Sequence, residues 1–415
     1  MLPNTGAGIS TAVAQATRLV VEPPAAVRGS VLPGVDPERA AAHATDAGVP
    51  LDLLARFDAS VRQTHRRARV VVVDVPADGQ AGLAAALRAN GIDARPPWPM
   101  QVLLDQSVPQ LRVPEVWESG LRGDGVRVAV VDTGIDATHP DLAGRLAARA
   151  DFSDAGDADD VGHGTHVSGI VAGDGAVYRG VAPGATLVVA KALSASGGTE
   201  DAVLAAMSWA SRQDVGVMNL SLGGPGSPRS PLAREVDALV AEGIIVCVAA
   251  GNAGPAHGTI SSPADARGAL TVGAADKTGA IAFYSSRGPV RGARYRKPDV
   301  VAIGGGVVHG AACAYSNGVT SARAHILASD RCVVPPRYVR MSGTSMAAPH
   351  VAGICALLLE AMAGRPRAAP ARARAVRTAI VRTARPIAGA SAIDGGAGLV
   401  DAAAALTWAS DRARH

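Results

Sequence analysis

The chain has 415 residues, which at about 100–200 residues per domain predicts two or three domains. Its 48% hydrophobic and 18% charged residues, with a mean hydropathy of +0.18, exclude intrinsic disorder for most of the chain. A net charge of +4 and an aromatic content of 3% do not suit a base-stacking surface, so no nucleic-acid partner is expected, and four cysteines exclude a small disulfide-stapled scaffold.

Residues 1–16 are predicted to be a disordered leader. They contain no Lys or Arg and are interrupted by Pro3, Gly6 and Gly8, so they lack the charged and apolar regions of a signal peptide, although Ala14–Ala16 fits a cleavage site. The alternative is that the true start lies upstream and a signal peptide is missing. No apolar run approaches the roughly 20 residues of a membrane-spanning helix, so no membrane partner is expected.

Residues 17–105 are predicted to form a small α/β module. Its strands are expected where β-branched residues are dense, and its helices where apolar residues recur on one face. The expected elements are a strand at Arg18–Glu22, a helix at Asp36–Ala47, a strand at Arg69–Val75, a helix at Asp78–Asn90 and a strand at Met100–Leu104. This order indicates a ferredoxin-like split βαβ arrangement.

Residues 106–410 are predicted to form a second, larger domain that begins with a Pro-rich linker at Gln106–Pro114. Strands alternate with helices along it: strands at Gly125–Asp132, Ala185–Ala190, Val215–Leu220 and Gly243–Ala249, and helices at His163–Ala172, Glu200–Arg212, Pro231–Glu242 and Thr344–Met362. This alternation predicts a doubly wound, mostly parallel sheet with helices on both faces. Functional residues should then follow the C-terminal ends of the strands.

The first candidate catalytic residue is Asp132, on which an apolar strand ends. A carboxylate held there, at the rim of a sheet, is suited to orienting a histidine. The alternative is an Asp that only caps a turn. A nucleotide-binding interpretation fails because no G-x-G-x-x-G pattern follows the strand.

The second candidate is His163, flanked by Gly162 and Gly164, which let a backbone or a substrate come close. A metal site formed with His166 is the rival interpretation, since the two histidines share a helix face. No Glu stands in a zincin position and no Cys lies nearby to complete such a site. A satisfied core histidine is the other alternative.

The third candidate is Ser345, which falls in the first turn of a helix after Ser342-Gly343-Thr344 and before the apolar run Val351–Leu359. The positive end of the helix dipole favours an activated hydroxyl there. A serine nucleophile needs a base, and His163 oriented by Asp132 would supply it. A plain helix-capping serine is the alternative.

The fourth candidate is Asn252, which follows Ala249-Ala250-Gly251 at a strand end. Its side-chain N–H could stabilise the oxyanion of a tetrahedral intermediate together with the backbone N–H of Ser345. A turn asparagine is the alternative.

These four segments, in the order Asp, His, Asn, Ser, closely resemble those of the subtilisin-like serine proteases, or subtilases. The resemblance covers residues 107–406 and ends in Gly395–Ala404, which is similar to the last helix of the family. It implies a subtilisin-like fold, a catalytic triad of Asp132, His163 and Ser345, and Asn252 as oxyanion donor. The implied activity is that of a serine endopeptidase; a catalytically silent binding scaffold and an exopeptidase subtype are the alternatives.

The same resemblance implies a groove for polypeptide substrates. The segment after the third predicted strand looks like the family's substrate-pairing edge, and two further segments look like the opposite wall and the floor of the S1 pocket. The implied substrate-binding residues are Ser221, Leu222, Gly223, Gly224, Ala250, Gly251 and Ser261. Because no acidic residue is evident in these walls, we expect an apolar P1 preference and broad specificity.

Gln106-Ser107-Val108-Pro109 is similar to the start of mature bacterial subtilisins, so residues 17–105 resemble a subtilase propeptide, which acts as an intramolecular chaperone and inhibitor. Cleavage is expected near Leu104 or Asp105. A permanent N-terminal domain is the alternative. The resemblance thus implies a secreted zymogen and a monomer.

No cofactor is expected for the chemistry, but a structural calcium ion is implied at Gln106 and Asp141, which match calcium-binding positions of many subtilases. The segment that supplies the remaining ligands in those relatives looks shortened here, at Gly173–Tyr178. A second acidic cluster is interpreted as a solvated loop, with a cation site as the alternative; it consists of Asp154, Asp157, Asp159 and Asp160.

The segment Gly304–Arg340 is longer than in most subtilases and is interpreted as surface decoration, with a contribution to the groove as the alternative. Within it, Cys313 and Cys332 would form a surface disulfide in an exported protein. Cys247 and Cys355 are expected to be buried free thiols. The Arg-rich segment 365–385 is interpreted as a solvated helix face, with a polyanion-binding strip as the alternative.

Overall fold

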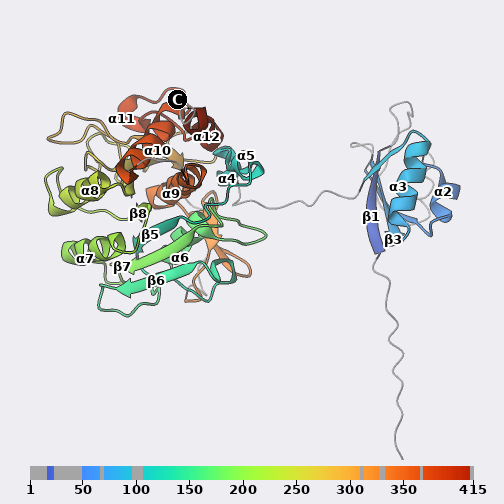
Figure 1. The fold of residues 1–415 in the computed structure, drawn as a ribbon, viewed down its shortest axis with the longest axis horizontal. Helices are drawn as coiled ribbons and strands as arrows, with labels where there is room; N and C mark the ends of the chain where they lie inside the picture. Colours follow the sequence, from blue (N-terminus) through green and yellow to red (C-terminus); the bar gives the residue numbers. More distant parts are fainter. Residues whose placement is uncertain are drawn as a thin grey trace, which may run out of the picture. The chain divides into compact units, whose positions relative to one another are not determined.

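The computed structural model describes residues 16–22, 49–65, 70–95, 106–308, 313–326, 332–364 and 368–411. The chain divides into two compact units, residues 1–100 and 101–415, which are described separately (Figure 1). The predicted leader at 1–16 lies almost wholly outside the described residues, as do the segments predicted as a helix at Asp36–Ala47 and a strand at Met100–Leu104.

The first unit contains a four-stranded antiparallel sheet in the order β2-β3-β1-β4. Its described elements are β1 (Ala16–Glu22), α2 (Leu51–Ala55), β2 (Ser60–His65), β3 (Val70–Pro76), α3 (Gln80–Ala89) and β4 (Asp93–Arg95). β1, β3 and α3 lie where the sequence places them, whereas β2 and β4 were missed because they are polar or short. Since one of its two predicted helices lies outside the described residues, the split βαβ arrangement stays a prediction.

This unit has a hydrophobic core of its own. Leu19 and Val21 of β1 and Val71 and Val73 of β3 are fully buried, and Leu83 and Leu87 of α3 lie in the same cluster. Each of these pairs lies two residues apart on a strand or four apart on the helix, so one face of each element points into the core.

The second unit is built on a seven-stranded parallel sheet in the order β11-β10-β9-β8-β5-β7-β6. Its strands are β5 (Arg127–Asp132), β6 (Leu146–Asp151), β7 (Thr186–Lys191), β8 (Val217–Leu220), β9 (Ile245–Ala249), β10 (Leu270–Ala275) and β11 (Val300–Ile303). The predicted parallel, doubly wound class is confirmed. The chain runs to one side of β5 for β6 and β7 and then to the other side for β8 to β11, so the order reverses between β5 and β8.

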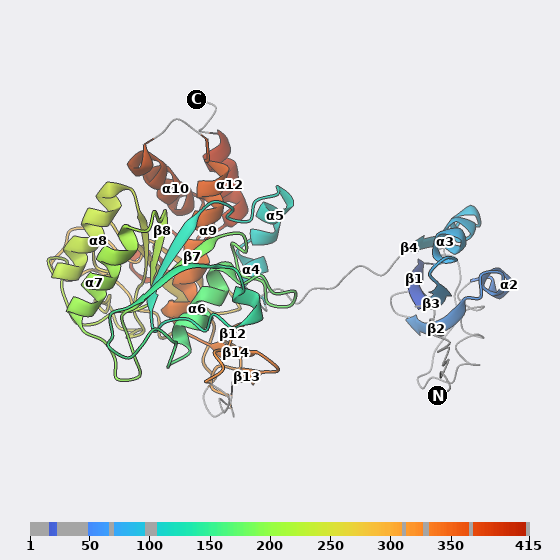
Figure 2. The same ribbon diagram turned by 60° about the horizontal axis from the view of Figure 1, so that its bottom comes forward.

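Helices cover both faces of this sheet (Figures 1 and 2). Its principal helices are α6 (His163–Ala172), α7 (Glu200–Ser211), α8 (Pro231–Glu242), α9 (Thr344–Ala361), α10 (Ala369–Thr383), α11 (Ala392–Gly395) and α12 (Ala402–Asp411). Alternate residues of β5 point to opposite faces of the sheet. Val128 and Val130 pack with α6 and α9 on one face. Ala129 and Val131 pack with α7 and α8 on the other.

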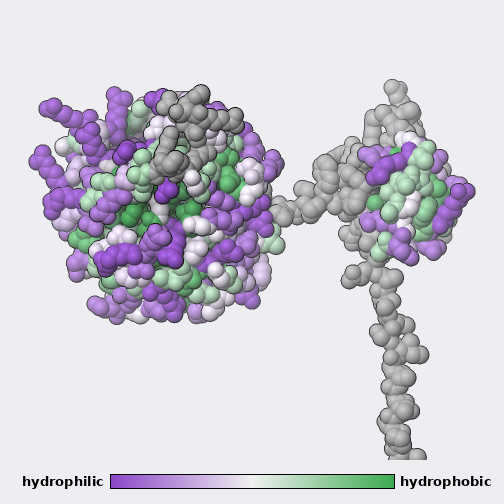
Figure 3. All heavy atoms as spheres, in the orientation of Figure 1, coloured by the Kyte–Doolittle hydropathy of each residue, from purple (hydrophilic) through white to green (hydrophobic). Residues whose placement is uncertain are grey.

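Helix α9 passes through the larger core. By length and a mean hydropathy of 1.3 it resembles a membrane-spanning helix, but 78% of it is buried inside the unit. The two thiols expected in the interior are there: the Sγ atoms of Cys247 in β9 and Cys355 in α9 lie 3.9 Å apart. The surface in Figure 3 is by contrast a mosaic of hydrophilic residues with small apolar patches. Arg374 and Arg382 of α10 are exposed, as expected for a solvated helix face.

The segment Gln106–Pro114, predicted as a linker, is instead helical and belongs to the larger unit. It forms α4 (Ser107–Gln110) and the start of α5 (Val113–Glu118), and Val108, Leu111 and Val113 are fully buried. The prediction was wrong because the prolines occupy positions that a helix start tolerates, while the apolar residues between them fill the core.

The long segment before the serine motif forms a small antiparallel sheet in the order β12-β14-β13 (Figure 2). Its strands are β12 (Val319–Ala322), β13 (Val333–Val334) and β14 (Tyr338–Met341). A disulfide joins Cys313 to Cys332. The interpretation as surface decoration was wrong, because Val319, Ala322 and Val339 are buried and β12 packs against α6.

Candidate active site

Asp132 and His163 form the central pair of the site. Asp132 ends β5 and is fully buried, and one of its oxygens, Oδ1, lies 2.7 Å from Nδ1 of His163 at the start of α6. The same oxygen accepts a hydrogen bond from the backbone N–H of Thr133 at 2.8 Å. With Nδ1–H donated to the carboxylate, the neutral imidazole presents Nε2 as an acceptor.

The charge on Asp132 also affects the protonation of His163. Burial disfavours the charged imidazolium, but the negative charge and the hydrogen bond of Asp132 outweigh it, so the pKa of His163 is raised above its usual value. The side chain remains 25% exposed, which leaves the ring accessible from the surface. An accessible imidazole with a raised pKa is suited to accepting and returning a proton.

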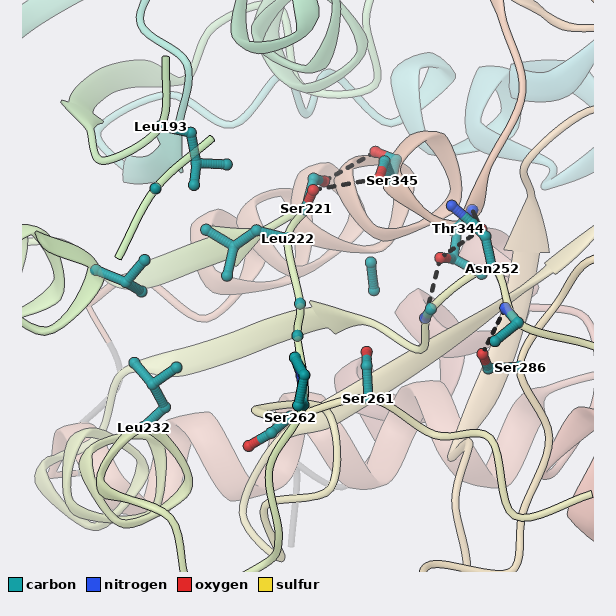
Figure 4. A pocket seen from close by; sticks show the side chains of 18 of the residues that line it. Leu193, Ser221, Leu222, Leu232, Asn252, Ser261, Ser262, Ser286, Thr344 and Ser345 are labelled. Carbon is teal, nitrogen blue, oxygen red and sulfur yellow. Dashed lines mark hydrogen bonds between the residues drawn. The ribbon is translucent and has the colours of Figure 1, made fainter. Parts of the chain in front are cut away.

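Ser345 lies in the first turn of α9, the helix that packs against both β5 and α6. Its hydroxyl donates to the carbonyl of Ser221 at 3.2 Å, and the hydroxyl of Ser221 donates to the carbonyl of Ser345 at 2.8 Å (Figure 4). These two bonds tie the C-terminal end of β8 to the start of α9. They hold Ser345 at the positive end of an 18-residue helix.

The amide of Asn252 is oriented by Thr344. Its Oδ1 accepts hydrogen bonds from the backbone N–H of Thr344 at 2.9 Å and from the hydroxyl of Thr344 at 3.0 Å (Figure 4). Because the oxygen is fixed in this way, the Nδ2 donors lie on the other side of the amide, next to Gly343. This arrangement suits a donor to a developing oxyanion.

A cavity of about 610 Å³ opens beside Ser345. Six of the predicted substrate-binding residues line it: Ser221, Leu222, Gly223, Gly224, Gly251 and Ser261. Ala250, the seventh, is fully buried and is not among the residues that line the cavity. The Ala250 carbonyl accepts from the N–H and the hydroxyl of Ser261, at 3.1 and 3.2 Å, so it holds the cavity floor from behind.

The cavity extends from Ser345 to the start of α7. Its far part is lined by the apolar side chains Leu193, Leu222 and Leu232 (Figure 4), and Val203 also lines the cavity. Glu200, the first residue of α7, also lines it, although the sequence showed no acidic residue in the predicted walls. Glu200 was missed because it lies some twenty residues before the predicted wall segments and reaches the cavity only through the packing of α7.

A family comparison agrees with this geometry: the profile of the Subtilase family matches residues 123–403. This chain belongs to the subtilase family. It is 38% identical to Serine protease AprX of Bacillus subtilis (strain 168) over 290 residues, which are 63% of this chain and 63% of AprX. It is 36% identical to Subtilisin DY of Bacillus licheniformis over 259 residues, 61% of this chain and 83% of that protein.

A solved structure shares the fold of this subtilase. It is that of a protease from Pseudoalteromonas arctica, with a TM-score of 0.61 and 29% sequence identity, over 72% of this chain and 94% of that one. The chain thus covers nearly all of that structure but less than two thirds of AprX.

The subtilase site contains a positioning residue that sequence reasoning missed, Asp159. It was interpreted as part of a solvated acidic loop, but it is 4% exposed. One of its oxygens accepts from the hydroxyl of Thr133 at 2.8 Å and the N–H of Gly162 at 2.7 Å, and the other accepts from the N–H and hydroxyl of Thr165. Asp159 therefore caps α6 just before His163 and links it to the residue after Asp132.

Of the other members of that acidic cluster, Asp160 is also engaged. It forms an ion pair with Lys191, a buried lysine at the end of β7 whose Nζ also donates to the carbonyls of Thr133 at 2.8 Å and Ala158 at 3.0 Å. Asp154 and Asp157 are exposed, as the loop interpretation expects. Two of the four residues, Asp159 and Asp160, thus hold the structure around the site, and the other two lie in a solvated loop.

The residues expected to bind calcium lie in different settings. Gln106 is exposed and precedes α4. Asp141 is buried in the short 3-10 helix η1 (Pro140–Leu142), where its carboxylate accepts a hydrogen bond from Tyr338. Within the described residues, no group of three or more His, Cys, Asp or Glu side chains is arranged to hold a metal.

Proposed function

We propose that this subtilase is a serine endopeptidase that cleaves polypeptides through an acyl-enzyme. The observation that carries the proposal is the 2.7 Å contact between Asp132 and His163. Ser345, in the first turn of α9 and lining the cavity, is the proposed partner of that pair. The relative Serine protease AprX, whose name describes a serine protease, supports the same reaction class.

In this proposal Ser345 attacks the scissile carbonyl carbon while His163 Nε2 takes the hydroxyl proton. The buried carboxylate of Asp132 stabilises the imidazolium that forms. Negative charge on the carbonyl oxygen is stabilised by the Nδ2 donor of Asn252 and by the N–H of Ser345, which lies in the helical turn where backbone donors lack partners. His163 then gives its proton to the leaving amine, and water, activated in the same way, releases the acyl group and restores Ser345.

We propose a broad specificity with an apolar P1 residue. The small residues Gly223 and Gly251 leave space next to the floor formed by Ser261. The leucines of the far part favour apolar side chains further along the substrate. Glu200 adds a negative charge at the rim of that part.

We propose further that the first unit is a propeptide and that the protein is exported. A separate compact unit with its own core, joined to the larger unit near residue 100, supports removal by cleavage near Leu104 or Asp105. The disulfide between Cys313 and Cys332 supports export, since structural disulfides persist in oxidising compartments.

A fluorophosphonate probe tests the reaction class, because it labels only an activated serine. The wild-type protein should be labelled and should cleave casein, and Ser345→Ala should do neither. The control is Ser211→Ala, which removes a hydroxyl that only bonds the Ser208 carbonyl at the end of α7. A folded wild-type protein that resists the probe would refute the proposal.

N-terminal sequencing tests the zymogen. The purified active enzyme should begin close to residue 105, and Ser345→Ala should keep the full chain. Active enzyme that retains residues before 90 would show a permanent domain instead.

A further inference from the structure

The carboxylate of Asp141 is engaged by a tyrosine from the small sheet. Asp141 is 8% exposed, and its Oδ2 accepts a hydrogen bond from the hydroxyl of Tyr338, the first residue of β14, at 3.0 Å. Tyr338 is itself buried and lies edge-on to Tyr178, with ring centroids 4.5 Å apart. The tyrosine is therefore fixed by packing as well as by its hydroxyl.

The surroundings of Asp141 do not fit a calcium ion, which takes about six to eight oxygen ligands. The Asp141 backbone carbonyl accepts from the N–H of Asp174 at 2.8 Å, and Gly175 lies so close to the carboxylate that even a Cβ there would clash. The nearby carboxylate of Asp174 faces two guanidinium groups, Arg145 at 3.6 Å and Arg179 at 3.5 Å. This neighbouring carboxylate is thus already paired with side-chain cations of the protein.

Residues next to the strands of the small sheet hold the same corner at two more points. The Arg337 carbonyl lies 2.9 Å from Nε2 of His139, which caps the start of η1. The backbone N–H and Nδ1 of His325 both lie 3.0 Å from the carboxylate of Asp136. Asp136, His139 and Asp141 belong to one loop after β5, so three successive contacts clamp it.

The sheet also contacts α6, the helix that begins with His163. Nε2 of His166 lies 3.1 Å from the carbonyl of Val319 and 3.2 Å from that of Val339, and the hydroxyl of Ser321 donates to the carbonyl of His166 at 2.9 Å. The loop after β5 and the helix after it are thus joined through one inserted element.

We propose that the small sheet takes the place of a divalent cation at Asp141, with the Tyr338 hydroxyl as the donor that replaces the ion. The Asp141 corner is then held without calcium, and its stability depends on Tyr338. This role does not depend on the enzyme activity, so it can be tested in an inactive variant.

Thermal unfolding of the full chain with Ser345→Ala, which avoids self-digestion, tests the proposal in EDTA and in millimolar calcium chloride. The melting temperature of this parent should agree within about 1 °C between the two conditions. Adding Tyr338→Phe should lower it by about 2–4 °C in both, because the buried Asp141 carboxylate loses a donor. The matched control, Tyr315→Phe, removes a hydroxyl from an exposed tyrosine of the same segment and should change little.

A calcium-induced rise in the parent that Asp141→Asn abolishes would overturn the proposal, and so would a Tyr338→Phe variant as stable as Tyr315→Phe. A calcium-induced rise that survives Asp141→Asn supports it, because the ion then binds elsewhere. If Tyr338→Phe does not fold, terbium luminescence of the folded parent decides. Emission that disappears in Asp141→Asn refutes the proposal. Emission that is unchanged in Asp141→Asn, or no emission from the parent, supports the proposal.

Discussion

The side-chain oxygen of Asn252 accepts a hydrogen bond from the backbone N–H of Thr344, the residue before the proposed nucleophile. The strand end that carries the proposed oxyanion donor and the helix that carries Ser345 are thereby fixed to each other. Asn252→Ala should therefore lower kcat by about 10²–10³, the range that applies to this kind of donor in a subtilisin, with little change in KM. Steady-state kinetics on a chromogenic peptide measures both; a change confined to KM would contradict the role.

Asp159 should matter for catalysis although it touches no substrate. In Asp159→Asn an amide N–H₂ replaces an acceptor that serves either Gly162 or Thr165, so α6 loses part of its cap and His163 loses its fixed position. We expect kcat/KM to fall at least about tenfold, with a lower melting temperature. Asp154→Asn is the matched control, because Asp154 is exposed and Asn tolerates its left-handed backbone. Equal activity of both variants would show that the cap has no such role.

The pH dependence of kcat/KM should reflect His163. The imidazole must be neutral to act as a base, and Asp132 raises its pKa, so activity should fall as the pH drops through a midpoint above about 6.5. Asp132→Asn removes the charge that raises the pKa. Its residual activity should then show a midpoint displaced to lower pH, and a midpoint that stays in place would contradict the pairing.

Stability should decline in acid because two buried histidines, His166 and His350, have lowered pKa values. Burial lowers the pKa of His166 to about 3 and that of His350 to about 4, with the charge of His163 adding to the effect on His166. Below about pH 6.5 these two histidines become protonated in the unfolded chain but stay neutral in the folded protein. Each histidine thus removes at most about 1.4 kcal/mol per pH unit from the free energy of unfolding as the pH falls.

Urea unfolding of Ser345→Ala between pH 7 and pH 4.5 measures this loss. His163 acts in the opposite sense, since its raised pKa adds stability on the acid side that is lost as the pH rises. His350→Gln should reduce the slope of the free energy of unfolding against pH by the contribution of one histidine, whatever the stability of this variant at pH 7. An unchanged slope would show that His350 is protonated in the folded state.

Ser261 should restrict the size of the P1 side chain. Its hydroxyl lies between Gly223 and Gly251, and a Cβ added to those glycines would stand 2.5 and 3.0 Å from it. Ser261→Gly should therefore raise kcat/KM for a P1 phenylalanine relative to a P1 alanine by about tenfold. Paired peptides that differ only at P1 give the ratio, and a ratio equal to that of wild type would place P1 elsewhere in the cavity.

Local sequence signals were enough to place Asp132 and Asn252 at strand ends and His163 and Ser345 at helix starts, because each stands within a long, distinctive motif. Strands such as β10 and β11 and the helices α4 and α5 were missed, since their short segments gain their structure from the core that buries them.

The contacts that sequence reasoning could not reach join residues far apart in the chain. Asp141 and Tyr338 are separated by 197 positions, and Lys191 and Asp160 by 31. The setting of Ala250 likewise depends on a partner further along the chain, since its carbonyl accepts from the hydroxyl of Ser261, eleven positions later.

The proposed nucleophile stands at one end of α9, and most of the rest of that helix is buried inside the larger unit. Amide hydrogens in the body of α9 can therefore exchange with solvent only when the whole unit opens, whereas surface loops exchange through small local fluctuations. The activated state of Ser345 should consequently be lost in the same cooperative transition that unfolds the larger unit. In a denaturant titration, probe labelling of Ser345 should disappear together with the tertiary structure and not before it.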